Sequence, residues 1–579
     1  MKAIKILAAA AVVIFSVSCK NNALDILPQD RLADEAIWND QKLIEAYHNE
    51  LYNSQVHGFN VSGAYGKYTD ELYNSLACCG GDLFKLNTYN SDNVGQLGAT
   101  IGDFWAESNG YLYNWNIAYQ YMRKINVFLE NMNTTTVNLP NKARMVAEAK
   151  FLRAFLYFNL IERFGGVPIV DKVYQLGDEA TFKRNTFEEC VAFIEKDITE
   201  ALPDLPDRYL STDPNYGRAT GDACKALLSR TYLYAASPLF NPAKDLQKWQ
   251  KAADAAEALL SSGYELYPDY QALFEMKQGD VQNEVIYSRG FSSSNGHGWT
   301  ADHLNRRFGG YGGWWGSSGP SGNLTDAYEM ANGQPPYLPD GTVNPLSGYD
   351  PNNPWANRDP RLEATIIHDG SVFNPGATPS APTTTFEMWV SEDGTTYGYD
   401  SWKTNGDNPR TNTVIKKFMP SEGPINGSTP REEQFPFFRL AEIYLNYAEA
   451  KFELGDEATA REYVNKVRHR PGVNLPDLPA TLTGEALRER IYHERRIELA
   501  FEAHRFFDVR RWGIATETEN TIIYAYDVIK DVATGTKRYK RVNLLDKTGT
   551  FQAYQSLLPI ARDELNRNPE LTQTKDWPQ

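Results

Sequence analysis

Apolar residues recur at helical spacing in two long parts of the chain, one before about residue 270 and one after residue 436. The clearest case is 141–164, where two apolar stripes predict a helix that is contacted from two sides. Paired glycines at 165–166 and Pro168 predict where it ends. The first stripe consists of Met145, Ala149, Leu152, Leu156 and Leu160, and the second of Phe151, Phe155 and Phe158.

Two further segments, 222–237 and 439–455, share this rhythm of small and aromatic residues. Each is followed by another helical stretch, at 249–266 and 458–470 respectively. Paired helices of this kind are similar to tetratricopeptide repeats, although their spacing is too irregular for one fixed period. Such pairs either form a concave partner-binding surface or serve as a rigid scaffold, and the sequence leaves both open.

Between these helical parts the composition changes. Gly, Pro, Asn, Ser and Thr become frequent, and short β-like runs at 284–289 and 363–369 are embedded in long loops. We therefore predict a mainly α protein: a tetratricopeptide-like helix-pair scaffold that carries a long, irregular insertion with short β-strands. The predicted scaffold covers 39–270 and 436–579, and the loop-rich, ligand-binding insertion covers 271–435.

The N-terminus predicts export and a lipid anchor. Lys2 and Lys5 precede an apolar run at 6–17 that is too short to span a membrane. The run is followed by Cys19, which is typical of a lipoprotein signal peptide over 1–18. Residues 19–38 then form a lipidated cysteine and a polar tether, so that the membrane is reached through the lipid only. The alternative is a secreted protein in which the cysteine is incidental.

Composition narrows the function. The chain has 579 residues and a formal net charge of −16, which argues against nucleic acid or an anionic lipid surface as a partner. Aromatic residues reach 13%, including 34 Tyr and 12 Trp, so we expect rings beyond those that a core needs.

No catalytic or metal-binding motif is present in the sequence. The remaining cysteines include Cys190 and Cys224, which lie in helical patterns and are expected as buried thiols, and none has zinc-ligand spacing. His493 and His504 lie in an Arg/Glu-rich segment that we interpret as a charged helix face. We therefore expect no cofactor, no metal and no enzymatic activity.

Candidate binding residues come from the aromatics. A glycine-rich stretch at 308–320 carries adjacent tryptophans, and such rings can stack on the apolar face of a sugar. A second candidate stretch is 101–115, with GGDLF close upstream. The predicted glycan-binding residues are Trp314, Trp315, Tyr311, Trp105, Asn109, Asp82 and Trp299. The alternative is that these rings fill gaps between loops and helices. Few basic residues are near these loops, Arg306 and Arg307 being the nearest pair, which favours a neutral glycan.

Five segments in order resemble the SusD/RagB-like outer-membrane lipoproteins. The similarity is carried by AEAKFLRAFLYFNLIERFGGVPIV (147–170), LTDAYEM (324–330), RDPRLEATI (358–366), HERRIELAFEAHRFFDVRRWG (493–513) and LLPIARDELNRNPELTQ (557–573). Ala503 stands where the family commonly has Gly, and Ala561 where it commonly has a second Pro.

The resemblance implies a cell-surface protein that lies as a lid over a SusC-type TonB-dependent transporter. It implies capture of oligosaccharide or polysaccharide through exposed aromatics, without catalysis, on the outer face of the outer membrane. The main alternative is a RagB-like member that captures peptides. A glycoside hydrolase and a scaffold that binds only protein are two further alternatives.

Overall fold

The computed structural model describes 34–55, 58–59, 80–85, 114–175, 177–178, 181–303, 305–308, 318–374, 381, 383–404, 408–423, 425, 430–546 and 548–577. Among these residues, no helix combines the length and the apolar character that crossing a bilayer requires.

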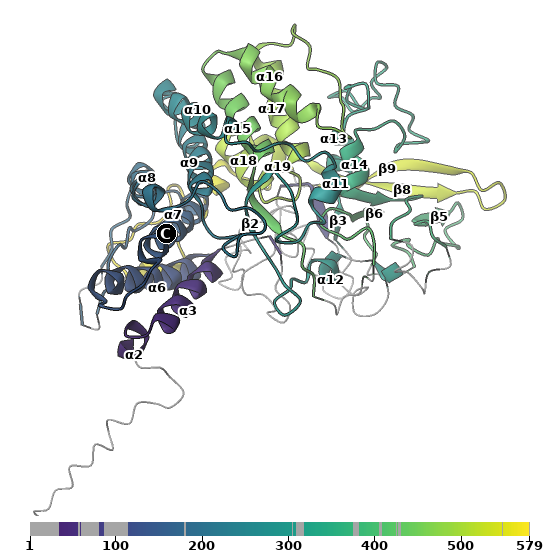
Figure 1. The fold of residues 1–579 in the computed structure, drawn as a ribbon. Coiled ribbons are helices and arrows are strands. Elements are labelled where there is room, and N and C mark those ends of the chain that lie inside the picture. Colours follow the sequence, from purple (N-terminus) through teal and green to yellow (C-terminus); the bar gives the residue numbers. More distant parts are fainter. Residues whose placement is uncertain are drawn as a thin grey trace, which may run out of the picture.

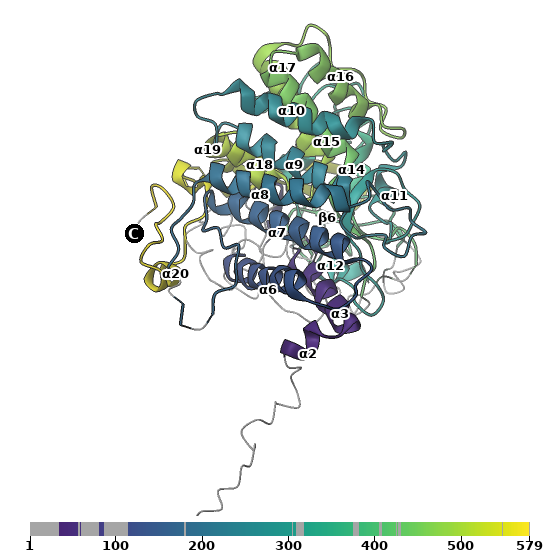
Figure 2. The same cartoon turned by 60° about the vertical axis from the view of Figure 1, so that its left-hand side comes forward.

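Helices dominate one side of the molecule and stack one on the next (Figures 1 and 2). The predicted helix at 141–164 is α7, Lys142–Phe164, and both of its stripes are buried. It ends where Gly165 adopts a φ of 74°, a conformation that glycine reaches without strain. The stack contains α2 (Asp34–Trp38), α3 (Gln41–Leu51), α6 (Trp115–Thr134), α7, α8 (Phe187–Ala201), α9 (Gly221–Ala236), α10 (Leu246–Leu260), α15 (Leu440–Glu453), α16 (Glu457–Arg468) and α17 (Gly484–Glu498).

Short strands organise the middle of the chain. As predicted, strands form within 284–289 and 363–369. The antiparallel pairs are β1 (Leu83–Lys85) with β3 (Ser318–Pro320), β2 (Val285–Arg289) with β7 (Phe435–Arg439), and β4 (Ile366–His368) with β6 (Thr413–Ile415). Short helices lie between them: α11 (Tyr270–Leu273), α12 (Trp299–His303), α13 (Gly322–Ala327) and α14 (Pro360–Thr365).

The expectation that the chain is helical throughout after residue 436 is wrong. Short helices α18 (Arg505–Arg511) and α19 (Ala515–Glu519) lead into a long antiparallel hairpin, and α20 (Arg562–Arg567) follows it (Figure 1). The hairpin consists of β8 (Ile522–Lys530) and β9 (Lys537–Asp546), and β5 (Trp389–Ser391) adds to β8 in parallel. Buried and partly exposed residues alternate along much of β8, because one face of the strand packs against the rest of the protein.

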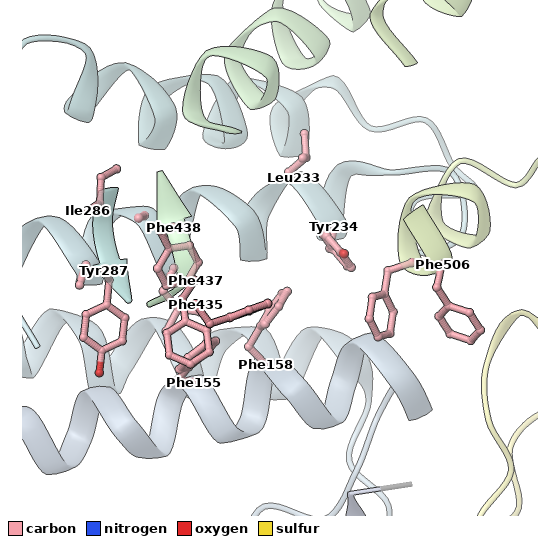
Figure 3. Packing of buried hydrophobic residues seen from close by; sticks show 14 of the residues in the cluster. Phe155, Phe158, Leu233, Tyr234, Ile286, Tyr287, Phe435, Phe437, Phe438 and Phe506 are labelled. Carbon is pink, nitrogen blue, oxygen red and sulfur yellow. The ribbon is translucent and has the colours of Figure 1, made fainter. Parts of the chain in front are cut away.

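Aromatic rings join the helical stack to the strands (Figure 3). Phe155 of α7 packs edge-on against Phe437, with the ring centroids 5.2 Å apart. It also packs against Phe438 in a tilted arrangement, with the centroids 5.6 Å apart. Phe158 contacts Tyr234 of α9 edge-on. The predicted second stripe of α7 is therefore the surface that receives β7 and α9. Cys190 and Cys224 are buried free thiols, as predicted.

Candidate functional site

The β1–β3 ribbon brings together described residues from the two parts of the chain that carry the predicted aromatic stretches. Lys85, the last residue of β1, lies opposite Ser318, the first residue of β3. Segment 86–113 therefore leaves the ribbon at the same end at which 309–317 enters it. Sequence-remote residues are brought together here by antiparallel pairing alone.

The described residues just before segment 309–317 are held in place by a buried ion pair. Phe308 precedes it, and the neighbouring Arg307 donates to Asp400 from Nε at 3.0 Å and from Nη2 at 2.6 Å. This bidentate pair is fully buried. Arg307 is therefore committed to the framework and is not a free cation of the binding loop.

Most of the predicted contact residues lie outside the described residues. These are Trp314, Trp315, Tyr311, Trp105 and Asn109, together with the predicted lipidation site Cys19. Asp82 and Trp299 are described, and both are buried.

The expectation of an exposed ring at Trp299 is wrong. The side chain is 1% exposed, and its indole N–H donates to the carbonyl of Lys417 at 3.1 Å. Its ring lies 5.0 Å from that of Phe59 and 5.4 Å from that of Phe418. Trp299 is the first residue of α12, and its ring is packed in the core. This agrees with the alternative interpretation, in which such rings fill gaps inside the protein.

Asp82 is part of the framework at the start of β1. Its Oδ1 accepts from Nε of Arg496 at 3.0 Å and also from Nη2 of the same residue. Its carbonyl accepts from the backbone N–H of Ser321 at 2.9 Å. Asp82 thus ties β1 to α17 and to the start of α13, and its carboxylate is already engaged.

A cleft of about 740 Å³ opens beside this anchor. Its walls are Gly80 and Gly81, helices α13, α17 and α18, strands β8 and β9, and the loop at 335–341. Arginine side chains, together with one histidine, are prominent among the residues that line it. Arg490, His493 and Arg496 follow one another at three-residue spacing on one face of α17. Arg505 and Arg541 complete the basic lining.

Two of these arginines are well satisfied. Arg541 forms an ion pair with Asp326, in which Nη2 lies 2.9 Å from Oδ2, and its guanidinium lies 4.4 Å from the ring centroids of both Tyr337 and Tyr524. Arg490 is paired with the buried carboxylate of Glu329. These contacts shape the cleft and hold its far wall.

His493 offers an acceptor to the cleft. Its Nε2 lies 2.6 Å from the carbonyl of Ala327, so Nε2 carries the proton and donates it. Burial, reinforced by the charge of Arg490, lowers the pKa of His493 well below its usual value and keeps the ring neutral. Nδ1 is buried and has no hydrogen-bond partner among the described residues.

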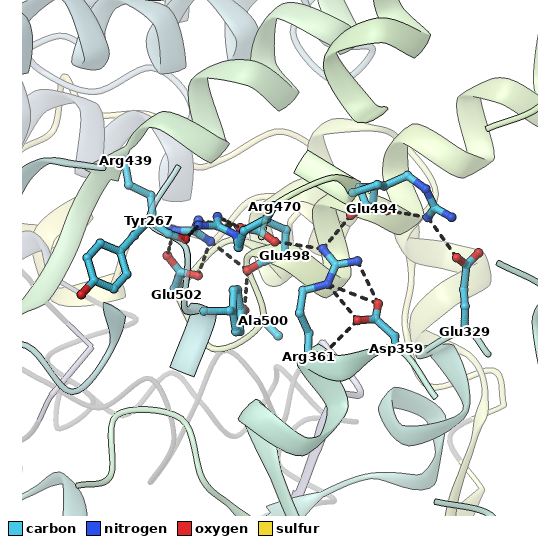
Figure 4. Close-up of polar contacts among 12 residues, drawn as sticks. Tyr267, Glu329, Asp359, Arg361, Arg439, Arg470, Glu494, Glu498, Ala500 and Glu502 are labelled. Carbon is cyan, nitrogen blue, oxygen red and sulfur yellow. Dashed lines mark hydrogen bonds and ion pairs between the residues drawn. The ribbon is translucent and has the colours of Figure 1, made fainter. Parts of the chain in front are cut away.

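A buried ionic network lies behind α17 (Figure 4). The interpretation of the 493–513 segment as a charged helix face is therefore wrong, because its charges are paired inside the protein. His504 is buried as well. The network joins Arg361, Arg439, Arg468, Arg470 and Lys417 to Glu284, Glu329, Asp359, Glu494, Glu498 and Glu502.

Sequence reasoning missed the arginines of the cleft. The three-residue spacing of 490, 493 and 496 was visible, but the same spacing describes a solvent-exposed face. Within the described residues, no group of His, Cys, Asp and Glu side chains is arranged to hold a metal ion.

Comparison with known proteins decides the family. The SusD family model matches residues 283–577. A second model, described as starch-binding and associating with the outer membrane, matches residues 24–233. The chain belongs to the SusD family.

Solved SusD-like structures share the fold. A SusD-like protein from Bacteroides fragilis is 28% identical, with a TM-score of 0.73 over 95% of this chain and 100% of that one. A SusD-like carbohydrate-binding protein from the same species is 26% identical, with a TM-score of 0.72 over 93% of this chain and 100% of that one. The starch-binding protein SusD of Bacteroides thetaiotaomicron is 24% identical over 75% of this chain and 73% of its own length. These matches confirm the resemblance and the mainly helical fold.

Proposed function

We propose that this SusD-family protein captures a glycan with aromatic side chains next to the β1–β3 ribbon and delivers it to a SusC-type TonB-dependent transporter. The observation that carries the proposal is the pairing of Lys85 with Ser318. It places Lys85, which precedes segment 86–113, opposite Ser318, which follows segment 309–317.

The chemistry of the proposed contact is stacking. An indole ring buries the apolar face of a pyranose, while polar neighbours take the hydroxyl groups at its edge. Trp314 and Trp315 supply the platform, Tyr311 and Trp105 extend it, and Asn109 is the polar neighbour. Asp82 supports the platform through Arg496, since its carboxylate is engaged there.

Glycan is favoured over peptide by the relatives. Similar proteins carry names that specify starch or carbohydrate as the ligand. Capture without catalysis is supported by the same family membership. Anchoring through a lipid on Cys19, with the protein facing the cell exterior, fits the outer-membrane association that the N-terminal family model describes.

Replacing both tryptophans tests the platform. A Trp314→Ala/Trp315→Ala variant should lose about 1–3 kcal/mol of binding free energy, which is the scale of a buried aromatic contact. Native affinity gels on a panel of neutral and acidic polysaccharides identify the ligand, and calorimetry with its oligosaccharide gives the affinity. A reducing-end assay on the same mixtures tests for hydrolysis.

Tyr397→Ala is the matched control, since this ring is 40% exposed and belongs to another part of the insertion. It should bind as the wild type does. Unchanged affinity in the double variant would refute the platform. Binding of oligopeptides in place of any glycan would favour the peptide-capturing alternative.

A further inference from the structure

One cation in the cleft has no hydrogen-bond or ion-pair partner among the residues that the structure describes. Arg505 is the first residue of α18 and lines the cleft, and its guanidinium donates no hydrogen bond to any described residue. Its Nε is fully buried. Arg490 and Arg541, by contrast, each have a carboxylate. Among the described residues, Arg505 is therefore the arginine of this cleft that has no carboxylate partner.

The surroundings of Arg505 favour an incoming anion. Burial, together with the positive charge of Arg496, lowers the pKa of Arg505 to about 10, so the group is still protonated at neutral pH. A desolvated guanidinium without an acceptor is unfavourable, and a bidentate oxyanion satisfies its geometry. Of the acidic groups that act on Arg505, Asp82 has a larger effect than Glu519 and Asp508, and Asp82 is already paired with Arg496.

Arg496 has capacity left as well. Within the described part of the chain, both of its hydrogen bonds go to the same oxygen, Oδ1 of Asp82, through Nε and Nη2, and Nη1 makes none. His493, one helical turn earlier, adds its unpartnered Nδ1 as an acceptor for a hydroxyl group. The described acidic residues that line the cleft do not form ion pairs with Arg505 or hydrogen bonds with His493. Asp326 is held by Arg541, Asp340 accepts from Thr342 in its own turn, and Glu517 is exposed.

We propose that this cleft is an anionic subsite, in which Arg505 and Arg496 bind the carboxylate or sulfate group of an acidic glycan. The inference rests on the proposed function, because it places a second part of the same ligand. Gly80 and Gly81 line the cleft, and only Asp82 separates them from β1. The three residues of β1 span about 10 Å, so the cleft lies one short strand from the start of segment 86–113.

This subsite changes the expected ligand class. The sequence favoured a neutral glycan because the candidate loops contain few basic residues. The cations come instead from α17 and α18, which lie far along the chain from those loops. One oligosaccharide would then contact both the proposed aromatic residues and the guanidinium groups of this cleft.

The test compares acidic oligosaccharides with their neutral counterparts. Calorimetry is run with an oligogalacturonide and its methyl ester, and with a sulfated oligosaccharide and its desulfated form. Sodium glucuronate and inorganic sulfate serve as isolated probes. The wild type should prefer one acidic form over its neutral counterpart, and added salt should weaken that preference. The pair that shows the preference tells a uronic acid from a sulfate ester.

Arg505→Gln should lower affinity for the preferred acidic ligand by about tenfold or more and leave neutral binding within about twofold. Arg567→Gln is the matched control, because this arginine is on α20 and its side chain is 68% exposed. It removes the same charge and should change neither affinity. Arg505→Lys keeps the charge but lacks the planar guanidinium that binds an oxyanion through two hydrogen bonds. Its affinity for the acidic ligand should therefore lie between those of the wild type and Arg505→Gln.

The outcomes separate the two proposals. Equal wild-type affinity for acidic and neutral forms, or an Arg505→Gln variant that binds acidic ligand as the wild type does, overturns the anionic subsite. If the tryptophan variant still loses binding in that case, the glycan-binding function stands. If no oligosaccharide binds but glucuronate or sulfate binds the wild type and not Arg505→Gln, the anion site at Arg505 stands, and both glycan capture and the assignment of this site to a glycan fail. If Arg505→Gln does not fold, the proposal is tested by the wild-type affinities for acidic and neutral ligands and by the affinity of Arg505→Lys for the acidic ligand.

Discussion

Glu498 shows how single residues hold the helix that carries the cleft. It is fully buried and contacts Arg361 at 2.9 Å, Arg439 at 2.7 Å and Arg470 at 2.5 Å. Burial opposes ionisation of its carboxyl group, but Arg470 and Arg439 outweigh burial and hold the pKa of Glu498 below its usual value. The carboxylate therefore joins α17 to α14 and β7 (Figure 4).

Replacing Glu498 with Gln should destabilise the protein by about 3–5 kcal/mol at neutral pH, since it leaves buried arginines uncompensated. A carboxyl group whose folded-state pKa is depressed stabilises the protein above its unfolded-state pKa of about 4.3. That contribution is lost as the pH falls towards the folded-state pKa. The difference between wild type and variant should therefore shrink below about pH 4, as urea unfolding at several pH values would show.

Glu462→Gln is the control for this measurement. Its side chain is 60% exposed and pairs with Lys466 on the surface of α16, so its loss should change stability by less than about 1 kcal/mol. A Glu498→Gln variant as stable as the wild type at neutral pH would show that the arginines do not depend on this carboxylate.

Which charges are buried could not be predicted from the sequence. Glu494 and Glu498 read as members of a solvated stripe, because helical spacing looks alike on an inner and an outer face. Their arginine partners include Arg361 and Arg439. Those partners are on other elements, and only the tertiary fold brings them into contact.

At the scale of elements, local pattern predicted helices well and strands unevenly. Helices α7, α9 and α15 begin and end within about two residues of the predicted ranges, since their periodicity and end signals are local. The β8–β9 hairpin was missed although IIYAYDVIK alternates in part. Each strand of the β1–β3 ribbon has three residues, too few for a recognisable pattern.

The β1–β3 ribbon makes a prediction about Gly319. A Cβ atom there would lie 2.3 Å from both Oγ1 of Thr411 and the carbonyl oxygen of Thr413, so Gly319→Ala must displace β3. We expect a loss of about 1–3 kcal/mol of stability and weaker glycan binding, because the base of both aromatic stretches moves. Thermal unfolding and calorimetry measure the two effects.

Gly221→Ala is the control for the ribbon variant, because an added Cβ there meets its neighbours only at 3.4 Å or more. It should leave glycan affinity unchanged. If Gly319→Ala binds glycan as the wild type does while its stability falls, the position of β3 does not set the binding loops.

At the scale of the whole molecule, the candidate site is assembled from three distant parts of the sequence. β1 comes from the N-terminal part, β3 and α13 from the insertion, and α17 and α18 from the C-terminal part. A single apolar cluster likewise runs from Ile44 to Leu571. Family motifs therefore predicted the fold. The arginine-lined cleft could not be predicted, because it depends on tertiary contacts that no local pattern encodes. The domain boundaries at 271 and 436 stay a prediction.

The position of α2 bears on how the whole molecule is attached. In Figures 1 and 2, α2 lies at one end of the molecule, away from α16 and α17. The predicted tether at 19–38 is wrong at its end, because its last five residues form α2 (Asp34–Trp38). A lipid on Cys19 would fix the protein to the membrane from that end. Cys19→Ala should move the protein from the membrane fraction to the soluble fraction, because a second membrane-binding element is not expected from the sequence. Fractionation and labelling with a fatty-acid analogue measure the change, and Cys78→Ala, which keeps Cys19, should stay in the membrane fraction. Retention of Cys19→Ala in the membrane would mean that something other than this lipid holds the protein there.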